Sequence, residues 1–190
     1  MKTIFLLLCL NLICLSTFAQ KTTDCLIKTS LGNIQIELYP EKAPVTVTNF
    51  LKYVDSQLYD GTNFYRVCTP ENEKNRSIQI QVIQGGDIPK GKQLEPIPIE
   101  TTNKTGITHQ NGTISMARDQ PNSATSSFFI CINNQPELDF AGKRNPDGQG
   151  FAAFGKVTKG MKVVKLIQAQ KEKDQTLINP VLIYSIHRID

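Results

Sequence analysis

Few of the residues that bring metals or activated nucleophiles into an enzyme are present in this chain. Only two histidines, His109 and His187, occur in 190 residues, and neither belongs to an HExxH-type spacing. The chain has no GxSxG, GxGxxG or phosphate-loop motif and no CxxC pair. Zinc sites, activated-serine hydrolases and nucleotide sites depend on such patterns. We therefore expect no metal, no cofactor and no nucleophilic chemistry.

Long runs of one charge are also missing. The net charge is only +4, with 21 Lys and Arg residues scattered among 17 Asp and Glu residues. Proteins that bind nucleic acid gather their basic residues in a patch or stripe, so no nucleic-acid partner is expected. A chain of 190 residues with ordinary hydrophobic content suffices for one domain with a sizeable core. The expected state is a single-domain monomer.

The one long apolar run lies at the N-terminus and predicts a signal peptide. Lys2 precedes an apolar stretch from Ile4 to Leu15, and the small residues Thr17 and Ala19 precede a cut after Ala19. This order is typical of a secretory signal, and the run is short for a membrane span. We divide the chain into a signal peptide (1–19), a short tail (20–24) and one domain (25–190). We expect export without stable membrane insertion, with an uncleaved anchor as the alternative.

The cysteines do not suggest a disulfide framework. Cys9 and Cys14 leave with the predicted signal, and the remaining Cys25, Cys68 and Cys131 are odd in number and widely spaced. Each is predicted to be a small buried hydrophobic residue. One disulfide with one free thiol is the alternative in an oxidising compartment.

Short alternating segments dominate the rest of the chain and predict strands. Residues 26–39 read as a hairpin whose turn contains Gly32 and Asn33. Further strands are predicted at 62–68, 78–84, 112–118, 127–133, 151–157 and 180–190. The charged residues 69–77 indicate a solvated loop, with a role in substrate choice as the alternative, and residues 88–110 indicate a long surface excursion.

Two segments have helical periodicity. One predicted helix starts near Pro44, and the other follows Gly160. Their apolar faces consist of Val47, Phe50, Leu51 and Val54 in the first and Met161, Val164 and Ile167 in the second. Strands and helices do not alternate regularly, so a doubly wound sheet is excluded. The pattern predicts a mainly β fold, either a closed antiparallel barrel or a sandwich, with two helices over its ends.

Five strings in order make the chain similar to a known family. They are "FYRV" at 64–67, "VIQGGD" at 82–87, "GTISMAR" at 112–118, "SSFFI" at 126–130 and "FAAFGKV" at 151–157. With these strings the chain resembles the cyclophilin family of peptidyl-prolyl cis-trans isomerases from about Cys25 to its end, and looks like the bacterial branch. The resemblance implies a closed eight-stranded antiparallel barrel capped by two α-helices, no cofactor, and proline-containing polypeptides as substrates. Together with the signal it implies the periplasm of a Gram-negative bacterium, or secretion.

The resemblance also implies a set of site residues. Arg66 matches the catalytic arginine, and Gln84 matches the glutamine that holds it. The implied substrate-binding residues are Val82, Ala117, Arg118, Ser127, Phe129, Leu138 and Phe151. Because Phe128 and Phe129 alternate faces, one belongs to the core and the resemblance assigns Phe129 to the groove. His109 is predicted to be a structural histidine, and an ion pair at the barrel rim is the alternative role for Arg66.

Several positions depart from the family pattern. The "PGFM" segment is absent, a longer stretch replaces it, and Gln81 and Val82 stand where Phe and Met are usual. Arg118 replaces an asparagine and Ser127 a glutamine. Glu137 stands where drug-sensitive members have tryptophan, which implies weak cyclosporin binding. Phe151 stands where other members have His or Tyr.

These residues lead to three hypotheses from different classes. The first is a prolyl isomerase that accelerates folding of exported proteins, in which Arg66 stabilises the twisted amide and an apolar pocket holds the proline ring. The second is a cyclophilin-fold peptide-binding module or chaperone with little turnover, suggested by the substitutions at Gln81, Arg118 and Ser127. The third is an unrelated barrel that carries small ligands, which would need a hollow interior.

Overall fold

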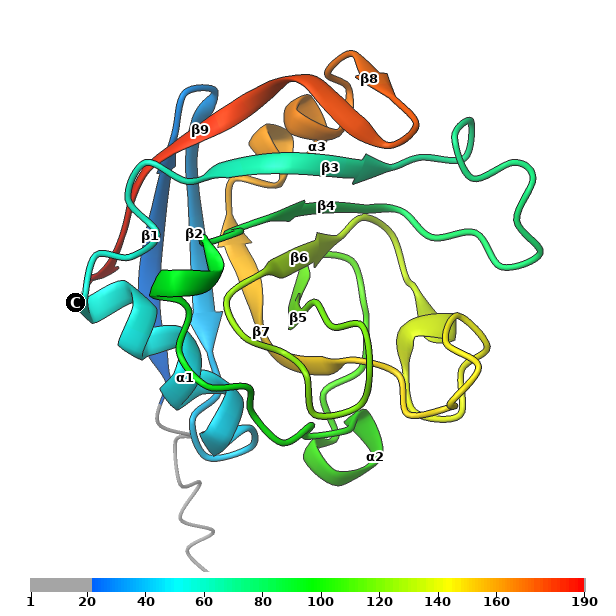
Figure 1. Ribbon diagram of the computed structural model, residues 1–190, viewed down its shortest axis with the longest axis horizontal. Coiled ribbons are helices and arrows are strands. Elements are labelled where there is room, and N and C mark those ends of the chain that lie inside the picture. Colours follow the sequence, from blue (N-terminus) through cyan, green and yellow to red (C-terminus); the bar gives the residue numbers. More distant parts are fainter. Residues whose placement is uncertain (1–21, 190) are drawn as a thin grey trace, which may run out of the picture.

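The computed structural model describes residues 22–189, and its main feature is one antiparallel sheet. The strands are β1 (Thr23–Thr29), β2 (Gly32–Leu38), β3 (Asn63–Cys68), β4 (Val82–Gly85), β5 (Thr113–Met116), β6 (Phe128–Cys131), β7 (Ala152–Lys159), β8 (Glu172–Lys173) and β9 (Thr176–Ile189). They pair in the order β1-β2-β7-β5-β6-β4-β3-β9, and β9 pairs back with β1 (Figure 1). Eight strands thus close a barrel, while β8 only forms a hairpin with the start of β9. The predicted closed eight-stranded barrel is confirmed.

The first hairpin shows how local chemistry shifts a predicted turn. The turn consists of Ser30 and Leu31, whereas Gly32 and Asn33 already belong to β2 and pair with Thr29 and Lys28. The Thr29 hydroxyl donates to the Gly32 carbonyl at 2.6 Å and accepts from the Leu31 N–H at 3.1 Å. This side chain closes the turn two residues before the predicted position. The barrel also begins at Thr23, two residues before the predicted domain boundary.

Within residues 22–189, three α-helices accompany the barrel, one more than predicted, and there are two short 3₁₀ helices, Lys90–Lys92 and Pro136–Leu138. The α-helices are α1 (Pro44–Asp55), α2 (Thr102–Thr105) and α3 (Met161–Gln168). The predicted apolar faces are buried in α1 and, at Val164 and Ile167, in α3. The α1 helix packs on β7 and β9 and α3 packs on β2, β3 and β4, on different sides of the barrel (Figure 1). No helix within residues 22–189 is long and apolar enough to cross a membrane.

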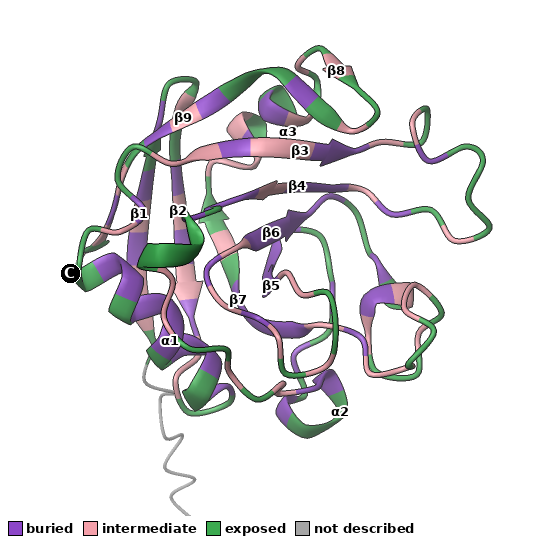
Figure 2. Ribbon diagram, viewed as in Figure 1, coloured by how far each residue is buried: buried purple, intermediate pink, exposed green. Residues whose placement is uncertain are grey.

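Phenylalanines and branched aliphatic residues fill the barrel. Phe64, Phe128 and Phe154 are fully buried, and Phe128 meets Phe50 and Phe64 edge to face. Figure 2 shows buried positions along every strand of the barrel wall. This packed interior does not fit the hollow carrier that the third hypothesis requires.

Two predicted segments differ from the observed structure. The strand expected at 78–84 is shortened to β4, because side chains bind the backbone before it: Arg144 donates to the Ile78 carbonyl, and the Ile80 N–H donates to Glu73. Residues 88–110 are also more than a surface excursion. They contain a short 3₁₀ helix (Lys90–Lys92) and α2, and they bury Ile88, Thr101, Thr102, Thr105, Ile107 and His109.

Three cysteines fall within the described residues. Cys25, Cys68 and Cys131 are all free and buried, as predicted, so the disulfide alternative is wrong for them. Burial raises the pKa of Cys68 to about 11 and that of Cys25 to about 12, which keeps both as neutral thiols at physiological pH. The predicted signal peptide, including Cys9 and Cys14, lies outside the described residues.

Candidate functional site

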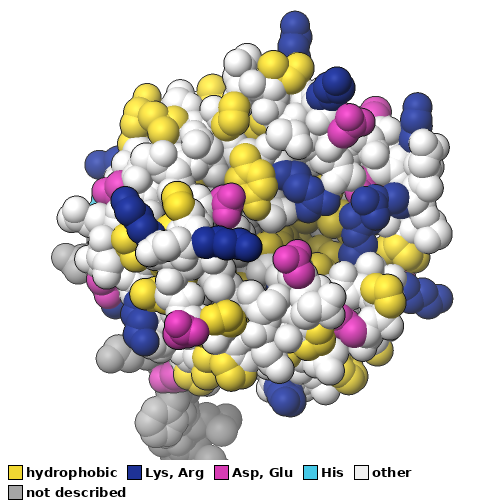
Figure 3. Space-filling view, viewed as in Figure 1, with side chains coloured by type: hydrophobic (Ala, Val, Ile, Leu, Met, Phe, Trp, Pro, Cys, Tyr) yellow, Lys and Arg dark blue, Asp and Glu magenta, His cyan; other side chains and the backbone are white. Residues whose placement is uncertain are grey.

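A groove of about 680 Å³ lies against the outer face of β3, β4 and β6. In β4 and β6 strand alternation produces this face, since neighbouring residues point into the barrel and away from it. In β3 a register shift between Phe64 and Arg66 brings the neighbours Tyr65 and Arg66 to the groove together. All nine residues that the sequence assigned to the site line this groove: Arg66, Val82, Gln84, Ala117, Arg118, Ser127, Phe129, Leu138 and Phe151. Figure 3 shows a hollow with a hydrophobic floor and several Lys and Arg side chains around its rim.

Arg66 is held by two glutamine side chains. Its Nη1 donates to Gln84 Oε1 at 2.7 Å, and its Nε and Nη2 donate to Gln175 Oε1 at 3.0 and 2.5 Å. Both partners are neutral, so the structural ion pair considered for Arg66 is not formed by these contacts. A guanidinium has five N–H groups. Within the described residues, one N–H on Nη1 and one on Nη2 therefore have no partner, on a side chain that lines the groove.

Gln84 also links Arg66 to Tyr65 and Ser127. Its Nε2 donates to the Tyr65 hydroxyl at 2.7 Å, and Tyr65 in turn lies 3.5 Å from the Ser127 hydroxyl. Burial raises the pKa of Tyr65, so its hydroxyl stays protonated at neutral pH. Gly85 and Gly86, which follow Gln84, allow core side chains to pack closely against the backbone, and do not form a nucleotide site. A Cβ on Gly86, whose φ is +74°, would lie 2.7 Å from the Phe128 ring.

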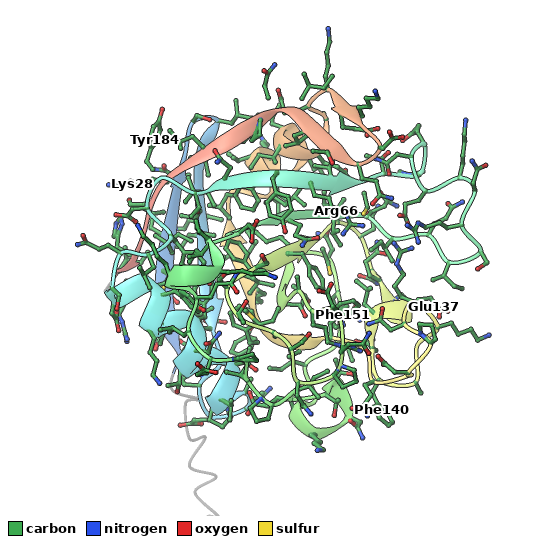
Figure 4. All side chains as sticks on the ribbon, in the orientation of Figure 1. Lys28, Arg66, Glu137, Phe140, Phe151 and Tyr184 are labelled. Carbon is green, nitrogen blue, oxygen red and sulfur yellow. The ribbon has the colours of Figure 1, made fainter. Side chains whose placement is uncertain are left out.

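An apolar floor lies beside the guanidinium. Phe129, Val82, Leu138 and Ile80 form a buried cluster of their own, separate from the barrel core that contains Phe128. The alternation predicted for the two phenylalanines is therefore confirmed. Phe151 stands against Phe129 with ring centroids 5.3 Å apart and planes at 87°. Figure 4 shows Arg66 on one side of the groove and Phe151 on the other.

His109 supports the floor from below. Its ring is fully buried and stacks on Phe129 with centroids 5.9 Å apart. Its Nδ1 lies 2.7 Å from Asp139 Oδ1, and its Nε2 lies 3.0 Å from the Ser115 hydroxyl. Both ring nitrogens are thus occupied, as expected for a structural histidine. The arrangement fixes the plane on which Phe129 rests.

Arg118 lines the groove but directs its donors into a loop. Its guanidinium makes a bidentate pair with Asp147 at 2.8 and 2.9 Å, and also donates to the Gly150 carbonyl. It lies over the Phe151 ring, 5.2 Å from the centroid. The hydrogen bond from Arg118 lowers the pKa of Asp147, so the pair is charged at neutral pH. The side chain at this position therefore braces Phe151.

Two loops contribute residues that sequence reasoning missed. Arg76 and Ile80 come from the segment between β3 and β4, and Arg144 and Asn145 come from the segment between Asp139 and Gly150. Buried Glu73 joins them, since Arg144 binds it and Arg76 Nε lies 3.1 Å away. The charged segment 69–77 was predicted to be a solvated loop, but it also contains the buried Glu73. Its only signal in the sequence was its extra length, which does not show which carboxylate is buried.

Glu137 stays at the margin of the site. Its carboxylate accepts the Lys143 N–H at 2.8 Å, which turns it toward its own loop (Figure 4). Within residues 22–189, no three or more His, Cys, Asp and Glu side chains gather in a way that could hold a metal ion. The groove thus combines a fixed cation with an apolar floor.

Comparisons with known proteins agree on one family. The model described as "Cyclophilin type peptidyl-prolyl cis-trans isomerase/CLD" matches residues 25–188. The chain is 42% identical over 159 residues to peptidyl-prolyl cis-trans isomerase A of Dickeya dadantii, covering 81% of this chain and 76% of that protein. It is 38% identical over 145 residues to peptidyl-prolyl cis-trans isomerase B of Escherichia coli, covering 74% and 80%.

Solved structures show the same fold. A cyclophilin-type isomerase of Cryptosporidium parvum superposes with a TM-score of 0.73 at 23% identity, over 90% of this chain and 99% of that one. The same protein solved in the presence of the dipeptide Ala-Pro superposes with a TM-score of 0.71 at 24% identity, over 88% and 99%.

Proposed function

The chain belongs to the cyclophilin-type peptidyl-prolyl cis-trans isomerases, and we propose that Arg66 is its catalytic cation. The observation that carries this proposal is the geometry of Arg66, a guanidinium fixed by Gln84 and Gln175 beside the floor that Phe129 forms. The substrates we propose are polypeptides with an X-Pro bond.

The reaction explains why no nucleophile is required. Rotation about a peptide bond loses amide resonance, with a barrier of about 18–20 kcal/mol, and breaks no covalent bond. X-Pro bonds exchange in roughly tens to hundreds of seconds without a catalyst. As the amide twists, the lone pair of the prolyl nitrogen is no longer delocalised and becomes a hydrogen-bond acceptor. A catalyst must therefore bind the twisted amide more tightly than either planar form.

Arg66 is suited to this differential binding. Its two remaining N–H groups are charged donors, and its three existing bonds hold the guanidinium plane still. A planar amide nitrogen is a poor acceptor, so the hydrogen bond gains strength only as the bond rotates. Preorganised donors of this kind contribute to transition states because they need not reorganise during the reaction.

The apolar floor performs the second task, which is to hold the proline ring while the preceding residue turns. Phe129, Leu138 and Val82 are all buried, and the His109 ring supports Phe129 from behind. Ala117 and Arg118 lie on the side of the groove where, by the family resemblance, the residues before proline bind. Arg118 serves there through its backbone, since its guanidinium is committed to Asp147 and Gly150.

The cellular role follows from the N-terminal segment. The apolar run and the small residues before Gln20 support cleavage and export, and we propose the periplasm as the location. The proposed role there is acceleration of folding in exported proteins that contain X-Pro bonds, by a monomeric enzyme.

A peptide-binding module or chaperone with little turnover is the second candidate. The observation that favours it is Arg118, which occupies a substrate-binding position with a side chain bound elsewhere. The floor and the cation would still hold a prolyl peptide without accelerating its rotation.

Exchange NMR on a short Ala-Pro peptide separates the two candidates. In the free peptide, cis and trans forms interconvert too slowly to give exchange cross-peaks between their signals. A catalytic amount of the enzyme should produce these cross-peaks. We expect these peaks together with saturable binding. Saturable binding without any exchange peak would favour the module and overturn the proposed activity.

A further inference from the structure

A buried carboxylate lies one side chain away from Arg66 and takes no part in the proposed reaction. The Glu73 side chain is 0% exposed. It accepts hydrogen bonds from both terminal nitrogens of Arg144 and from the Ile80 N–H, and Arg76 Nε lies 3.1 Å from its Oε1. Two guanidinium groups therefore compensate one buried anion, which offsets much of the cost of removing it from water.

Gln175 joins this carboxylate to Arg66. Its Nε2 donates to Glu73 Oε1 at 2.6 Å, while its Oε1 accepts from Arg66 Nε and Nη2. A carboxylate can only accept, so the NH₂ end of the amide must face Glu73 and the oxygen must face Arg66. The anion thus decides which way the amide points and polarises its oxygen toward the guanidinium.

The backbone at Gln175 favours a different residue. Asp174 and Gln175 form the turn between β8 and β9, with φ values of +52° and +73°. Such turns prefer Asn and Gly because other side chains are strained in the left-handed region. The Val67 N–H donates to the Gln175 carbonyl at 2.9 Å, which fixes the turn against β3. A long amide at this strained position indicates a role for its side chain.

We infer that Gln175 and Glu73 are positioning residues, which hold the Arg66 guanidinium through one neutral amide anchored on a buried carboxylate. This inference rests on the proposed function of Arg66. A carboxylate in direct contact with Arg66 would form an ion pair and weaken the donor that the substrate needs. The amide holds the guanidinium without adding charge, and Glu73 is itself neutralised by Arg144 and Arg76.

The first test compares two glycine substitutions in the same turn. Gln175→Gly removes the side-chain amide and suits the left-handed backbone. Asp174→Gly relieves the backbone strain at the neighbouring position and leaves the contacts of Arg66 unchanged. We expect Asp174→Gly to melt at or above the wild-type temperature. Gln175→Gly should melt somewhat lower, because the relief of backbone strain is offset by the hydrogen bonds lost to Arg66 and Glu73. Only Gln175→Gly should lower kcat for a prolyl peptide, by about ten- to a hundredfold with little change in KM, since small misplacements of a catalytic group have effects of this size.

The second test determines whether Glu73 acts on Arg66 through Gln175. Glu73→Gln should lower kcat less than Gln175→Gly does, and in the Gln175→Gly background it should lower kcat no further, because its effect passes through the missing amide. The ¹⁵Nε–H signal of Arg66 gives a readout independent of turnover. It should be slow to exchange with water in the wild type and in Asp174→Gly, and fast in Gln175→Gly.

Three results would overturn the inference: an unchanged kcat and Arg66 signal in Gln175→Gly, an equal loss in Asp174→Gly, or an effect of Glu73→Gln that is the same in both backgrounds. A wild type that binds peptide without accelerating exchange would refute the proposed function instead. The Arg66 signal would still decide whether Gln175 and Glu73 fix the guanidinium.

Discussion

At the scale of single residues, the site depends on the neutral partners of Arg66, which is bound by amides and by no carboxylate among the described residues. The sequence showed an arginine in an apolar strand, and such a residue is usually paired with a carboxylate. In the structure its three hydrogen bonds all go to amide oxygens, from Gln84 and Gln175. The charge is therefore held in place and stays available to a ligand in the groove.

The two adjacent phenylalanines allow a matched comparison. Phe128→Leu removes ring contacts from the barrel core and should lower the free energy of unfolding by about 1–2 kcal/mol, leaving kcat/KM unchanged. Phe129→Leu removes the floor ring that meets Phe151 and His109. It should weaken binding of a prolyl peptide about fivefold, the equivalent of roughly 1 kcal/mol of aromatic contact. Urea unfolding and steady-state kinetics on both variants test this, and equal kinetic effects would refute the assignment of Phe129 to the groove.

Glu137 provides a prediction about inhibition. The resemblance implies an indole at this position in cyclosporin-sensitive members, whereas the Glu137 carboxylate here binds its own loop. We expect weak cyclosporin inhibition of the wild type. Glu137→Trp should increase the affinity about tenfold or more, as a buried aromatic anchor commonly contributes over roughly 1 kcal/mol. Because the wild type has no tryptophan, isothermal titration calorimetry is used to measure the cyclosporin affinity of both proteins. Tight binding by the wild type would contradict the prediction.

At the scale of elements, the groove is shaped by two loops rather than by strands alone. The segment between β3 and β4 and the segment between Asp139 and Gly150 meet through Glu73 and Arg144. In the segment between β3 and β4, alternation predicted a strand at 78–84, of which only the part from Val82 onward forms. Charge predicted a solvated loop at 69–77, which is incomplete because Glu73 is buried. A buried ion pair depends on two segments far apart in the chain, so local patterns do not record it. Strand alternation within β4 and β6, by contrast, depends on neighbouring residues and was predictable.

The Glu73 ion pair should make stability depend on pH. Burial alone would raise the pKa of Glu73, but the hydrogen bonds and charges of Arg144 and Arg76 lower it overall. A carboxyl with a lower pKa in the folded state stabilises the fold above its ordinary pKa of 4.5 and loses that contribution as the pH falls through the folded value. Glu73→Gln should lower the free energy of unfolding at neutral pH by about 3–5 kcal/mol.

Urea denaturation at a series of pH values measures this contribution. The difference between wild type and Glu73→Gln should narrow as the pH falls from about 5 toward about 3. Glu71→Gln is the matched control, since Glu71 is exposed in the same loop, and it should show little difference at any pH. A constant difference for Glu73→Gln across this range would mean that the carboxylate charge does not stabilise the fold.

At the scale of the whole molecule, the sequence predicted the barrel and the membership of the groove well. The strands that carry Arg66, Gln84 and Phe129 are short and have local patterns. Hydrophobic alternation and the sequence segments shared with the cyclophilin family were therefore enough to predict them. The supports behind them were not predictable. Gln175 lies 109 positions from Arg66 and reaches it only because β9 pairs with β3. Such contacts follow from the closure of the barrel, which no local pattern records.

Export gives a prediction for the intact chain. Cleavage after Ala19 should leave a mature protein that begins at Gln20 and keeps only Cys25, Cys68 and Cys131. Mass spectrometry of the protein from the periplasm of an expressing bacterium measures the N-terminus. Ala19→Phe, which places a large residue before the cut, should block processing. A wild-type protein that retains residues 1–19 would contradict the signal-peptide prediction.

The central claim is that a fixed guanidinium accelerates rotation about the X-Pro bond. Its most direct test is the rate of cis-trans exchange of one prolyl peptide with wild type and with Arg66→Ala, at equal concentrations of folded protein. We predict that Arg66→Ala keeps most of the peptide affinity, which the Phe129 floor supplies, and loses about 10²–10³ in rate, the usual effect of removing a transition-state donor. An Arg66→Ala protein with the full wild-type rate would show that the cation is not the catalyst.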